Sequence, residues 1–331
     1  MKALVTGGGG FLGGAVVRKL LARGDSVRSF TRSAYPWLAE LGVEQIHGDL
    51  GNPAEVRAAV AGCDVVFHVA AKAGVWGRYK EFHAANVVGT QNVIDACRQA
   101  GVSKLIYTST PSVVHTGADL EGATENLPYA KHFLAHYPAT KALAEAAVLS
   151  ANDSALSTVA LRPHLIWGPG DPHLIPRVLA RAKSGKLRRI GTRPVKVDVT
   201  YVDNAADAHL LAADKLAIGA ACAGKAYFLS NGEPVLLWDF LNRILTDAGL
   251  PPVTRSVPVV VARAGAFALE AVYRTLRLRA EPPTTRFVVA QLSTSHWYDI
   301  AAAKRDLGYA PAVSVAEGLR RLAASTQSGI S

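Results

Sequence analysis

A tyrosine and a lysine stand four residues apart in the segment YPATK, which begins at Tyr137 and ends at Lys141. Four-residue spacing in a helix places both side chains on one face. A free tyrosine has a pKa of about 10 and is a poor acid or base near neutrality. A lysine ammonium nearby favours the phenolate and lowers that pKa. The pair therefore predicts proton transfer to or from a bound substrate, with Tyr137 as the acid and Lys141 as its activator.

Three hydroxyl side chains close the β-rich run KLIYTST, namely Thr108, Ser109 and Thr110. Parallel α/β sheets bind ligands beyond the carboxyl ends of their strands, so these hydroxyls are expected at a ligand crevice. We predict that one of them donates a hydrogen bond to the substrate oxygen beside Tyr137. Taken alone, the spacing from Tyr137 to Lys141 also describes an ordinary amphipathic helix. Its place after this strand and after a nucleotide-binding half favours catalysis.

A glycine-rich turn joins a predicted strand at Lys2–Thr6 to a predicted helix at Phe11–Arg23. Gly7, Gly10 and Gly13 form the pattern GxxGxxG, which supplies the φ freedom of a tight turn and lets a pyrophosphate approach the backbone. The helix that follows presents free N–H groups and a positive dipole end to the phosphates. The predicted pyrophosphate ligands are Gly7, Gly10, Phe11, Leu12 and Gly13.

The second predicted strand ends in the residues FTRS, with Arg32 and Ser33 at its end. An acidic residue here would bind the ribose hydroxyls of NAD, and none is present. Arg32 can instead pair with a 2′-phosphate through its planar fork, and Ser33 or Thr31 can add a hydroxyl. The sequence therefore predicts NADPH or NADP⁺ as the cofactor. The alternative is that Arg32 is an ordinary surface arginine.

Two further strand ends complete the predicted cofactor site. Asp49 and Leu50 follow the third strand in the run HGDL, where we expect Asp49 to accept from the adenine amino group. The alternative for Asp49 is a turn or helix-capping carboxylate. Ala70 and Ala71 end the fourth strand in the run HVAA, and their small side chains would let the chain pass close to the ribose.

These residues need a scaffold of alternating strands and helices, and the sequence supplies one. Continuous Val- and Ile-rich runs separated by helical patterns predict a parallel sheet covered on both faces. The expected fold class is α/β, a Rossmann-type doubly wound parallel sheet with a smaller C-terminal substrate domain. The expected strands are Lys2–Thr6, Ser26–Phe30, Val43–His47, Asp64–Val69, Lys104–Ser109 and Ser157–Leu161. The expected helices are Phe11–Arg23, Pro53–Ala61, Lys80–Ala100 and Tyr137–Ala151.

The pattern loosens after Pro163, where several prolines follow in quick succession. We therefore expect residues 1–168 to form the NADP-binding domain and residues 169–331 to lie mainly on the substrate side. Residues 195–215 are an exception, because a β-like run followed by a helix is expected to return to the main sheet. The apolar pattern of Val257–Leu278 either caps an acyl tunnel, docks on a partner, touches a membrane surface or simply covers the substrate domain.

The composition of the 331 residues bounds the classes of function. Half are hydrophobic and 19% are charged, which suits a sizeable core, and the net charge of +10 favours an anionic ligand. Three widely spaced cysteines fit a reducing compartment rather than a disulfide framework or a cysteine-based zinc site. Without a signal-peptide pattern or a run of about 18 uncharged apolar residues, we expect a cytoplasmic protein.

Metal and nucleic acid are not expected as ligands. His115, His132 and His136 lie near the catalytic segment but show no metal-ligand spacing. The basic stretch Gly185–Lys196 is short and interrupted by apolar residues, which argues against a nucleic-acid surface.

The motifs TGGGGFLG, HVAA, NVVGT, YTSTPSVV, YPATK and LRPHLIWGPGD occur in the order typical of the extended short-chain dehydrogenase/reductase family, which this sequence resembles over nearly its whole length. By register with the family's strand-end motif, the resemblance implies that Thr110 is the catalytic hydroxyl, with Ser109 as the fallback. It also implies that Lys141 binds the ribose, and that Asn86 supports the site structurally or through water. The nicotinamide-side loop implied by the family runs from Pro163 to Ile166.

Within that family, segments such as AAKAGVWGRY and RAEPPTTRFV resemble 3β-hydroxysteroid and sterol-carboxylate dehydrogenases. They resemble more closely a bacterial group of reductases that act on 2-alkyl-3-oxoalkanoates in long-chain olefin biosynthesis. This implies NADPH-dependent reduction of an anionic, lipid-like substrate to the 2-alkyl-3-hydroxyalkanoate. The candidate protein partners it implies are a second copy of the chain, a β-lactone synthetase and a β-lactone decarboxylase.

Three other functions stay open as alternatives. A 3β-hydroxysteroid or sterol-4-carboxylate dehydrogenase running the other way with NAD is disfavoured by Arg32. A nucleotide-sugar epimerase would return its cofactor to the starting redox state in each turnover. A non-catalytic NADP-binding protein would not need Tyr137, Lys141 and Thr110.

The substrate-side residues come from two loops. Lys72, Trp76, Arg78 and Tyr79 follow the fourth strand, in a loop where a cation and aromatics could hold a carboxylate and an acyl chain. Lys72 is expected to reach the cofactor as well. The alternative is a solvated loop. His164 directly follows Pro163 and either contacts substrate or packs within its loop.

Overall fold

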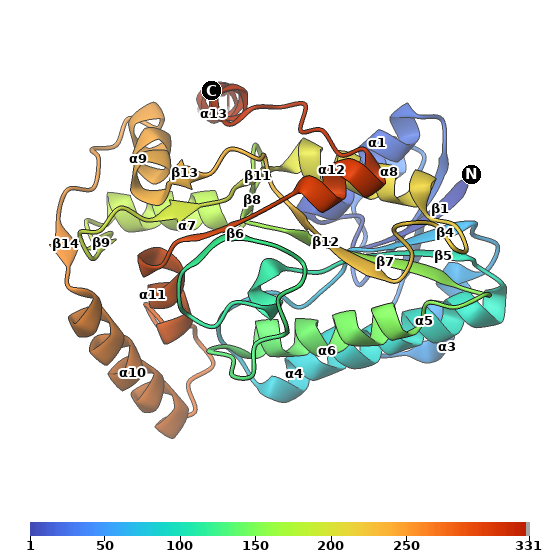
Figure 1. Ribbon diagram of the computed structural model, residues 1–331, viewed down its shortest axis with the longest axis horizontal. Helices are drawn as coiled ribbons and strands as arrows, with labels where there is room; N and C mark the ends of the chain where they lie inside the picture. Colours follow the sequence, from blue (N-terminus) through green and yellow to red (C-terminus); the bar gives the residue numbers. More distant parts are fainter. Residues whose placement is uncertain (329–331) are drawn as a thin grey trace.

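The computed structural model describes residues 1–328 of the chain. Its main sheet has seven parallel strands in the order β12-β7-β5-β4-β1-β2-β3 (Figure 1). The strands are β1 (Lys2–Thr6), β2 (Ser26–Thr31), β3 (Glu44–His47), β4 (Val65–His68), β5 (Lys104–Thr108), β7 (Ser157–Pro163) and β12 (Lys225–Leu229). The order reverses between β1 and β4, which opens a crevice at their carboxyl ends. The predicted α/β class with a Rossmann-type sheet is confirmed.

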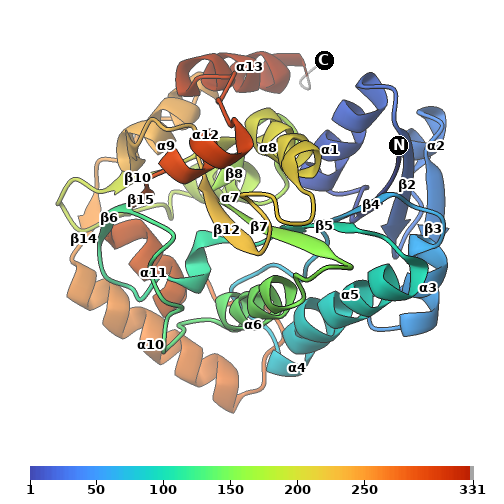
Figure 2. The same ribbon diagram turned by 45° about the vertical axis from the view of Figure 1, so that its right-hand side comes forward.

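Helices cover both faces of this sheet because its strands alternate their side chains between two cores. In β1, Ala3 and Val5 belong to the core beneath α1 and α8, whereas Leu4 packs on the side of α3, α5 and α6. Figure 2 shows the two groups of helices on opposite sides of the strands. The helices are α1 (Phe11–Ala22), α3 (Pro53–Val60), α5 (Gly89–Ala100), α6 (His136–Ser150) and α8 (Val202–Lys215).

The long helix predicted at Lys80–Ala100 is interrupted in the structure. It begins as α4 (Tyr79–His83), continues as a π-helical turn, η1 (Ala84–Val88), and ends as α5. Asn86 lies in this turn and is 2% exposed. π-turns of this kind occur frequently at functional sites, and this one lies where the helix passes the crevice.

The second half of the chain adds helices and small sheets beyond the crevice. Its helices are α7 (Leu174–Lys183), α9 (Leu237–Asp247), α10 (Val259–Thr275), α11 (Arg286–Ser293), α12 (Ala301–Leu307) and α13 (Val315–Ser328). The first half of the chain also contains the short helix α2 (Pro36–Glu40) and the 3-10 turn η2 (Pro111–Val113). A four-stranded sheet joins β13 (Val235–Leu236), β10 (Lys196–Val197), β15 (His296–Tyr298) and β6 (Leu120–Ala123). Two short pairs join β8 (Ile166–Trp167) to β11 (Thr200–Tyr201) and β9 (Arg189–Ile190) to β14 (Ser256–Val257).

The expectation for residues 195–215 fails for the strands and holds for the helix. Strand β10 joins the small four-stranded sheet and β11 pairs with β8, so neither returns to the main sheet. The buried Asp198 between them accepts from the N–H of Tyr298, which ties this segment to the small sheet. Helix α8 does pack against the main sheet, beside α1. The returning strand is β12, which the sequence analysis missed, and the division at residue 168 stays a prediction.

Among the described residues, no helix combines the length and the apolar character needed to cross a membrane.

Candidate active site

One continuous cavity of about 1280 Å³ lies at the carboxyl ends of the main-sheet strands and extends to α7, α9, α10 and α11. Most of the residues predicted for the site lie in its wall. They are Gly7, Gly10, Phe11, Leu12, Gly13, Arg32, Ser33, Asp49, Leu50, Ala70, Ala71, Lys72, Ser109, Thr110, Tyr137, Pro163, His164 and Ile166. Three predicted residues are not in the wall: Lys141, Trp76 and Arg78.

The glycine loop forms a cradle that side chains would fill. Gly7 has φ of +71°, and a Cβ on Gly13 would lie 2.1 Å from the carbonyl oxygen of Gly7. A Cβ on Gly9 would lie 2.2 Å from the ring of Tyr35, and one on Gly7 would lie 3.0 Å from Ala70. Helix α1 begins here without an acidic residue in its first turn. The bare backbone and the helix N-terminus fit the pyrophosphate of a dinucleotide.

The ends of β2 and β3, where the adenosine of the cofactor is expected, line one part of the cavity. Arg32 is exposed there, and Tyr35, which the sequence analysis missed, stands over the glycine loop. Asp49 accepts a hydrogen bond from the N–H of Gly51 at 2.7 Å, and its own N–H donates to the carboxylate of Glu55 at 2.7 Å. These bonds give Asp49 the turn role that the sequence left as an alternative. Its contact with adenine stays a prediction.

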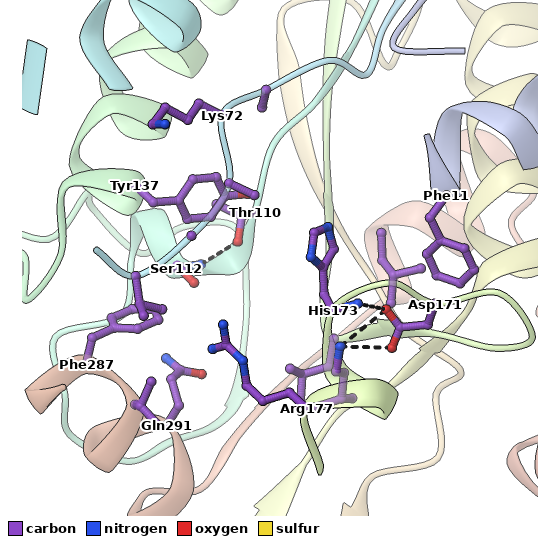
Figure 3. A pocket seen from close by; sticks show the side chains of 18 of the residues that line it. Phe11, Lys72, Thr110, Ser112, Tyr137, Asp171, His173, Arg177, Phe287 and Gln291 are labelled. Carbon is purple, nitrogen blue, oxygen red and sulfur yellow. Dashed lines mark hydrogen bonds between the residues drawn. The ribbon is translucent and has the colours of Figure 1, made fainter. Parts of the chain in front are cut away.

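Tyr137 lies in the first turn of α6 and faces the same space as Thr110 (Figure 3). The Thr110 hydroxyl accepts from the N–H of Ser112 at 3.2 Å, so it keeps its own proton to donate. The buried hydroxyl of Ser109 has no hydrogen-bond partner within the described residues. Thr108 is committed elsewhere, since its hydroxyl bonds the Nε2 of His209 at 2.7 Å. Ser109 and Thr110 are thus the two hydroxyls placed to meet a ligand.

The expected lowering of the Tyr137 pKa by Lys141 stays a prediction, because burial dominates the surroundings of both groups in this structure. Desolvation by the surrounding protein raises the pKa of Tyr137 to about 12, against a smaller lowering by the hydrogen bond with Thr110. The Lys141 ammonium donates to the carbonyl of Thr108 at 2.5 Å, and burial lowers its pKa to about 7 although Glu145 acts to raise it. The Lys141 ammonium is therefore engaged with the end of β5. Tyr137 stays protonated near neutrality, which suits a proton donor.

Asn86 joins the cofactor side of the cavity to the helix that carries Tyr137. Its Oδ1 accepts from the N–H of Lys72 at 2.7 Å, and its Nδ2 donates to the Lys72 carbonyl at 3.1 Å and to the hydroxyl of Thr140 at 3.0 Å. Both ends of this buried amide are thus engaged with two segments of the site. The geometry agrees with the supporting role that the resemblance implied for Asn86.

The loop that the resemblance places beside the nicotinamide lies between β7 and β8. Leu165 has φ of +41°, which is a strained conformation for a leucine and is typical of segments held in place for function. The Nδ1–H of His164 donates to the carbonyl of Asp198 at 2.8 Å, and burial lowers the pKa of His164. His164 is thus neutral and firmly packed while also lining the cavity. Its contact with substrate stays a prediction.

The predicted substrate loop after β4 contributes less than expected. Trp76 lies against the end of α10, where its Nε1–H donates to the carbonyl of Leu278 at 3.3 Å and its ring lies 5.7 Å from the guanidinium of Arg274. Arg78 immediately precedes α4 and is not in the cavity wall. Trp76 and Arg78 thus lie outside the cavity wall, and their contact with substrate stays a prediction. Lys72 lines the cavity, and its ammonium pairs with Glu81 at 3.3 Å.

The far end of the cavity is mainly apolar. Its wall there includes Leu237, Trp238, Phe240 and Leu241 of α9, Ala262, Gly265, Ala266 and Leu269 of α10, and Phe287, Val288 and Leu292 of α11. Helix α10 therefore covers an apolar chamber with one face and leaves Val260, Val261 and Phe267 exposed on the other. His173, Arg177 and Gln291 also line the cavity and face the space beside Tyr137 and Thr110 (Figure 3). They carry no local motif, and only the tertiary fold brings them opposite Tyr137.

The parallel sheet, the glycine cradle and the phenol facing a strand-end hydroxyl define an oxidoreductase that uses a nicotinamide dinucleotide. The sequence profile of the 3-beta hydroxysteroid dehydrogenase/isomerase family matches residues 4–259, and the chain belongs to this family.

Relatives and solved structures agree with this membership. The 2-alkyl-3-oxoalkanoate reductase of Stenotrophomonas maltophilia (strain K279a) is 56% identical over 98% of this chain and 99% of the relative. The decarboxylating sterol-4-alpha-carboxylate 3-dehydrogenase of Mus musculus is 39% identical over 97% of this chain and 89% of the relative. Among solved structures, the UDP-glucose 4-epimerase of Thermus thermophilus in complex with NAD is 26% identical with a TM-score of 0.74 over 99% of both chains.

Proposed function

We propose that this chain reduces the ketone of a 2-alkyl-3-oxoalkanoate to the 2-alkyl-3-hydroxyalkanoate with NADPH. One observation carries the proposal: a single cavity joins the glycine cradle, the paired Tyr137 and Thr110, and a large apolar chamber closed by α9, α10 and α11. A cofactor, a reacting ketone and long alkyl chains would each find a matching part of that cavity.

The names of the relatives support the same substrate class. A 2-alkyl-3-oxoalkanoate carries its carboxylate on the carbon next to the ketone carbon. A sterol 4-carboxylate oxidised at position 3 has the same relation between the carboxylate and the reacting carbon. Both names thus describe interconversion of a β-oxo acid and a β-hydroxy acid attached to a large apolar body. We extend that chemistry to this chain.

The residues of the site divide the work of the reduction. When bound, the nicotinamide supplies the hydride. Tyr137 donates its phenolic proton to the carbonyl oxygen, and the hydroxyls of Thr110 and Ser109 stabilise the negative charge that develops there. The apolar walls exclude water and hold the alkyl chains, which fixes the ketone against the phenol. Lys141 holds the end of β5 through the carbonyl of Thr108.

We further propose that the reaction belongs to long-chain olefin biosynthesis in the cytoplasm. The product would be a β-hydroxy acid, which a β-lactone synthetase can close and a β-lactone decarboxylase can then convert to an olefin. A homodimer and contacts with these two enzymes are the partners we propose.

Chain length should control the apparent affinity for substrate. Each buried CH₂ contributes about 0.8 kcal/mol, so KM should fall about fourfold for each added carbon until the chamber is full. The measurement is the reverse reaction of a series of 2-alkyl-3-hydroxy acids with NADP⁺, because 3-oxo acids decarboxylate readily. A steroid and UDP-glucose complete the panel. Better turnover of either of those, or of short acids, would contradict the proposed substrate.

Arg32 should set the choice of cofactor. Arg32→Ala should weaken NADPH binding by about 1.5–3 kcal/mol, the worth of a charge-assisted hydrogen bond, and leave NADH binding almost unchanged. Titration of both cofactors by nucleotide fluorescence measures this. Arg57→Ala, an exposed arginine of α3 outside the cavity wall, is the matched control. Equal affinity of the unmutated protein for NADH and NADPH would be the contrary result.

A further inference from the structure

Two arginines one helical turn apart on α7 line the apolar chamber. Figure 3 shows Arg177 pointing from α7 into the space that Tyr137 and Thr110 face. Arg181 lies in the same wall, and burial together with the charge of Arg177 lowers its pKa. Like charges so close in a chamber with apolar walls favour the binding of an anion.

One of these arginines, Arg177, already forms an ion pair with a carboxylate of the protein. The strap, residues 276–285, connects α10 to α11, and its Glu281 pairs with Arg177 through both carboxylate oxygens at 3.0 and 3.1 Å. Arg181 donates to the carbonyl of Pro283 in the same strap. At the other end of the strap, the carbonyl of Leu278 accepts a hydrogen bond from the Nε1–H of Trp76. Arg277, next to Leu278, has a strained φ of +53°.

The ion pair of Arg177 and Glu281 is weak enough for another carboxylate to replace Glu281. The two side chains are 51% and 38% exposed, and ion pairs this open to solvent are weak. The charge balance favours a further anion, because Lys186 and Arg188 also line the cavity. Asp171 in that wall is committed to capping α7, where its carboxylate accepts three backbone N–H groups.

We propose that Arg177, assisted by Arg181, is the receptor for the substrate carboxylate and that Glu281 is the internal carboxylate which leaves when substrate binds. The inference rests on the proposed function for its substrate class. An arginine fork matches a carboxylate, and replacing one carboxylate by another keeps the guanidinium paired throughout. An ester or amide cannot make this exchange. Lys72, the cation expected from the sequence, lies on the opposite side of Tyr137 and is paired with Glu81 (Figure 3).

When Glu281 leaves Arg177, the strap also loses one of its contacts with α7. The strap then keeps its bonds to Arg181 and Trp76, so substrate binding and opening of the strap are linked. Removing the Glu281 carboxylate should therefore favour binding, whereas removing Arg177 should oppose it. The two substitutions have opposite signs, which an unspecific loss of structure does not produce.

The test compares a 2-alkyl-3-hydroxy acid with its methyl ester as substrates. Steady-state kinetics of their oxidation with NADP⁺ give a KM for each. Arg177→Gln should raise KM for the acid about two- to fivefold, the worth of a solvent-exposed ion pair, and should leave KM for the ester unchanged. Glu281→Gln should lower KM for the acid about two- to fivefold, by removing a weak competitor. Glu317→Gln, which breaks exposed pairs with Arg320 and Arg321 on α13, is the control and should change neither. An unchanged preference for acid over ester in Arg177→Gln would overturn the inference.

Binding without turnover separates this inference from the proposed function. Calorimetric titration with 2-hexyldecanoate, a branched acid that lacks the oxo group, should give a Kd that weakens in Arg177→Gln and tightens in Glu281→Gln. That pattern without any turnover of 3-oxo or 3-hydroxy acids would retain the carboxylate receptor and overturn the proposed reaction. Equal Kd values for all variants would overturn the receptor whichever substrate is turned over.

Discussion

Replacing Tyr137 by phenylalanine should cut turnover about 10²–10⁴-fold, the usual contribution of a general acid. The variant keeps the ring that packs between α6 and the cavity and loses only the phenolic proton. Because desolvation holds the pKa of Tyr137 at about 12, the wild-type phenol is protonated throughout the neutral range and can supply that proton to the substrate oxygen. NADPH titration should show nearly unchanged binding, so the loss should fall on kcat.

The neighbouring hydroxyls give a graded comparison. Thr110→Val should cost more activity than Ser109→Ala, because Thr110 is the hydroxyl that Tyr137 faces directly. Tyr79→Phe is the matched control, since Tyr79 is an exposed tyrosine of α4 outside the cavity wall. Near-full activity of Tyr137→Phe would show that another donor supplies the proton.

The buried ion pair between Glu145 and Arg162 should have the largest effect on stability. The guanidinium bonds both carboxylate oxygens at 2.9 and 2.6 Å, and the two side chains are 0% and 4% exposed. Glu145→Ala would leave a buried, uncompensated arginine, and should lower the free energy of unfolding by about 3–5 kcal/mol. Urea unfolding followed by circular dichroism measures the change.

Two further variants make that result specific. Arg243→Ala breaks an exposed pair with Asp247 on α9 and should change the free energy of unfolding by less than about 1 kcal/mol. The double replacement of Glu145 and Arg162 by methionine removes both charges together, so it should recover most of the stability lost in Glu145→Ala. If Glu145→Ala and Arg243→Ala cost the same, the buried pair has no special role.

The parts of the molecule that depend on local sequence were predictable. The glycine loop, the first six main strands and the segment from Tyr137 to Lys141 each carry a short-range pattern, and the structure places them at the expected strand and helix positions. The direction of the Lys141 side chain was not predictable in this way. It depends on the buried carbonyl of Thr108, which lies 33 residues away in the chain.

The substrate side depended on contacts between distant segments. Arg177 meets Glu281 across 104 residues, and Trp76 meets Leu278 across 202. Neither pair has a sequence pattern that predicts it, so the contact of Trp76 with Leu278 could not be foreseen, although Lys72 of the same loop does line the cavity. The same reason explains why β12 was missed: its five residues become a strand only because β7 offers them a partner.

The position of β12 has a consequence for synthesis of the chain on the ribosome. Strand β7 is buried along all seven of its residues, and its outer edge pairs with β12, which is synthesised about 60 residues later. At roughly 5–20 residues per second, several seconds pass in which an apolar strand edge has no native partner. The nascent chain therefore carries an aggregation-prone edge during that interval, and a chaperone that shields it would act before Leu229 emerges.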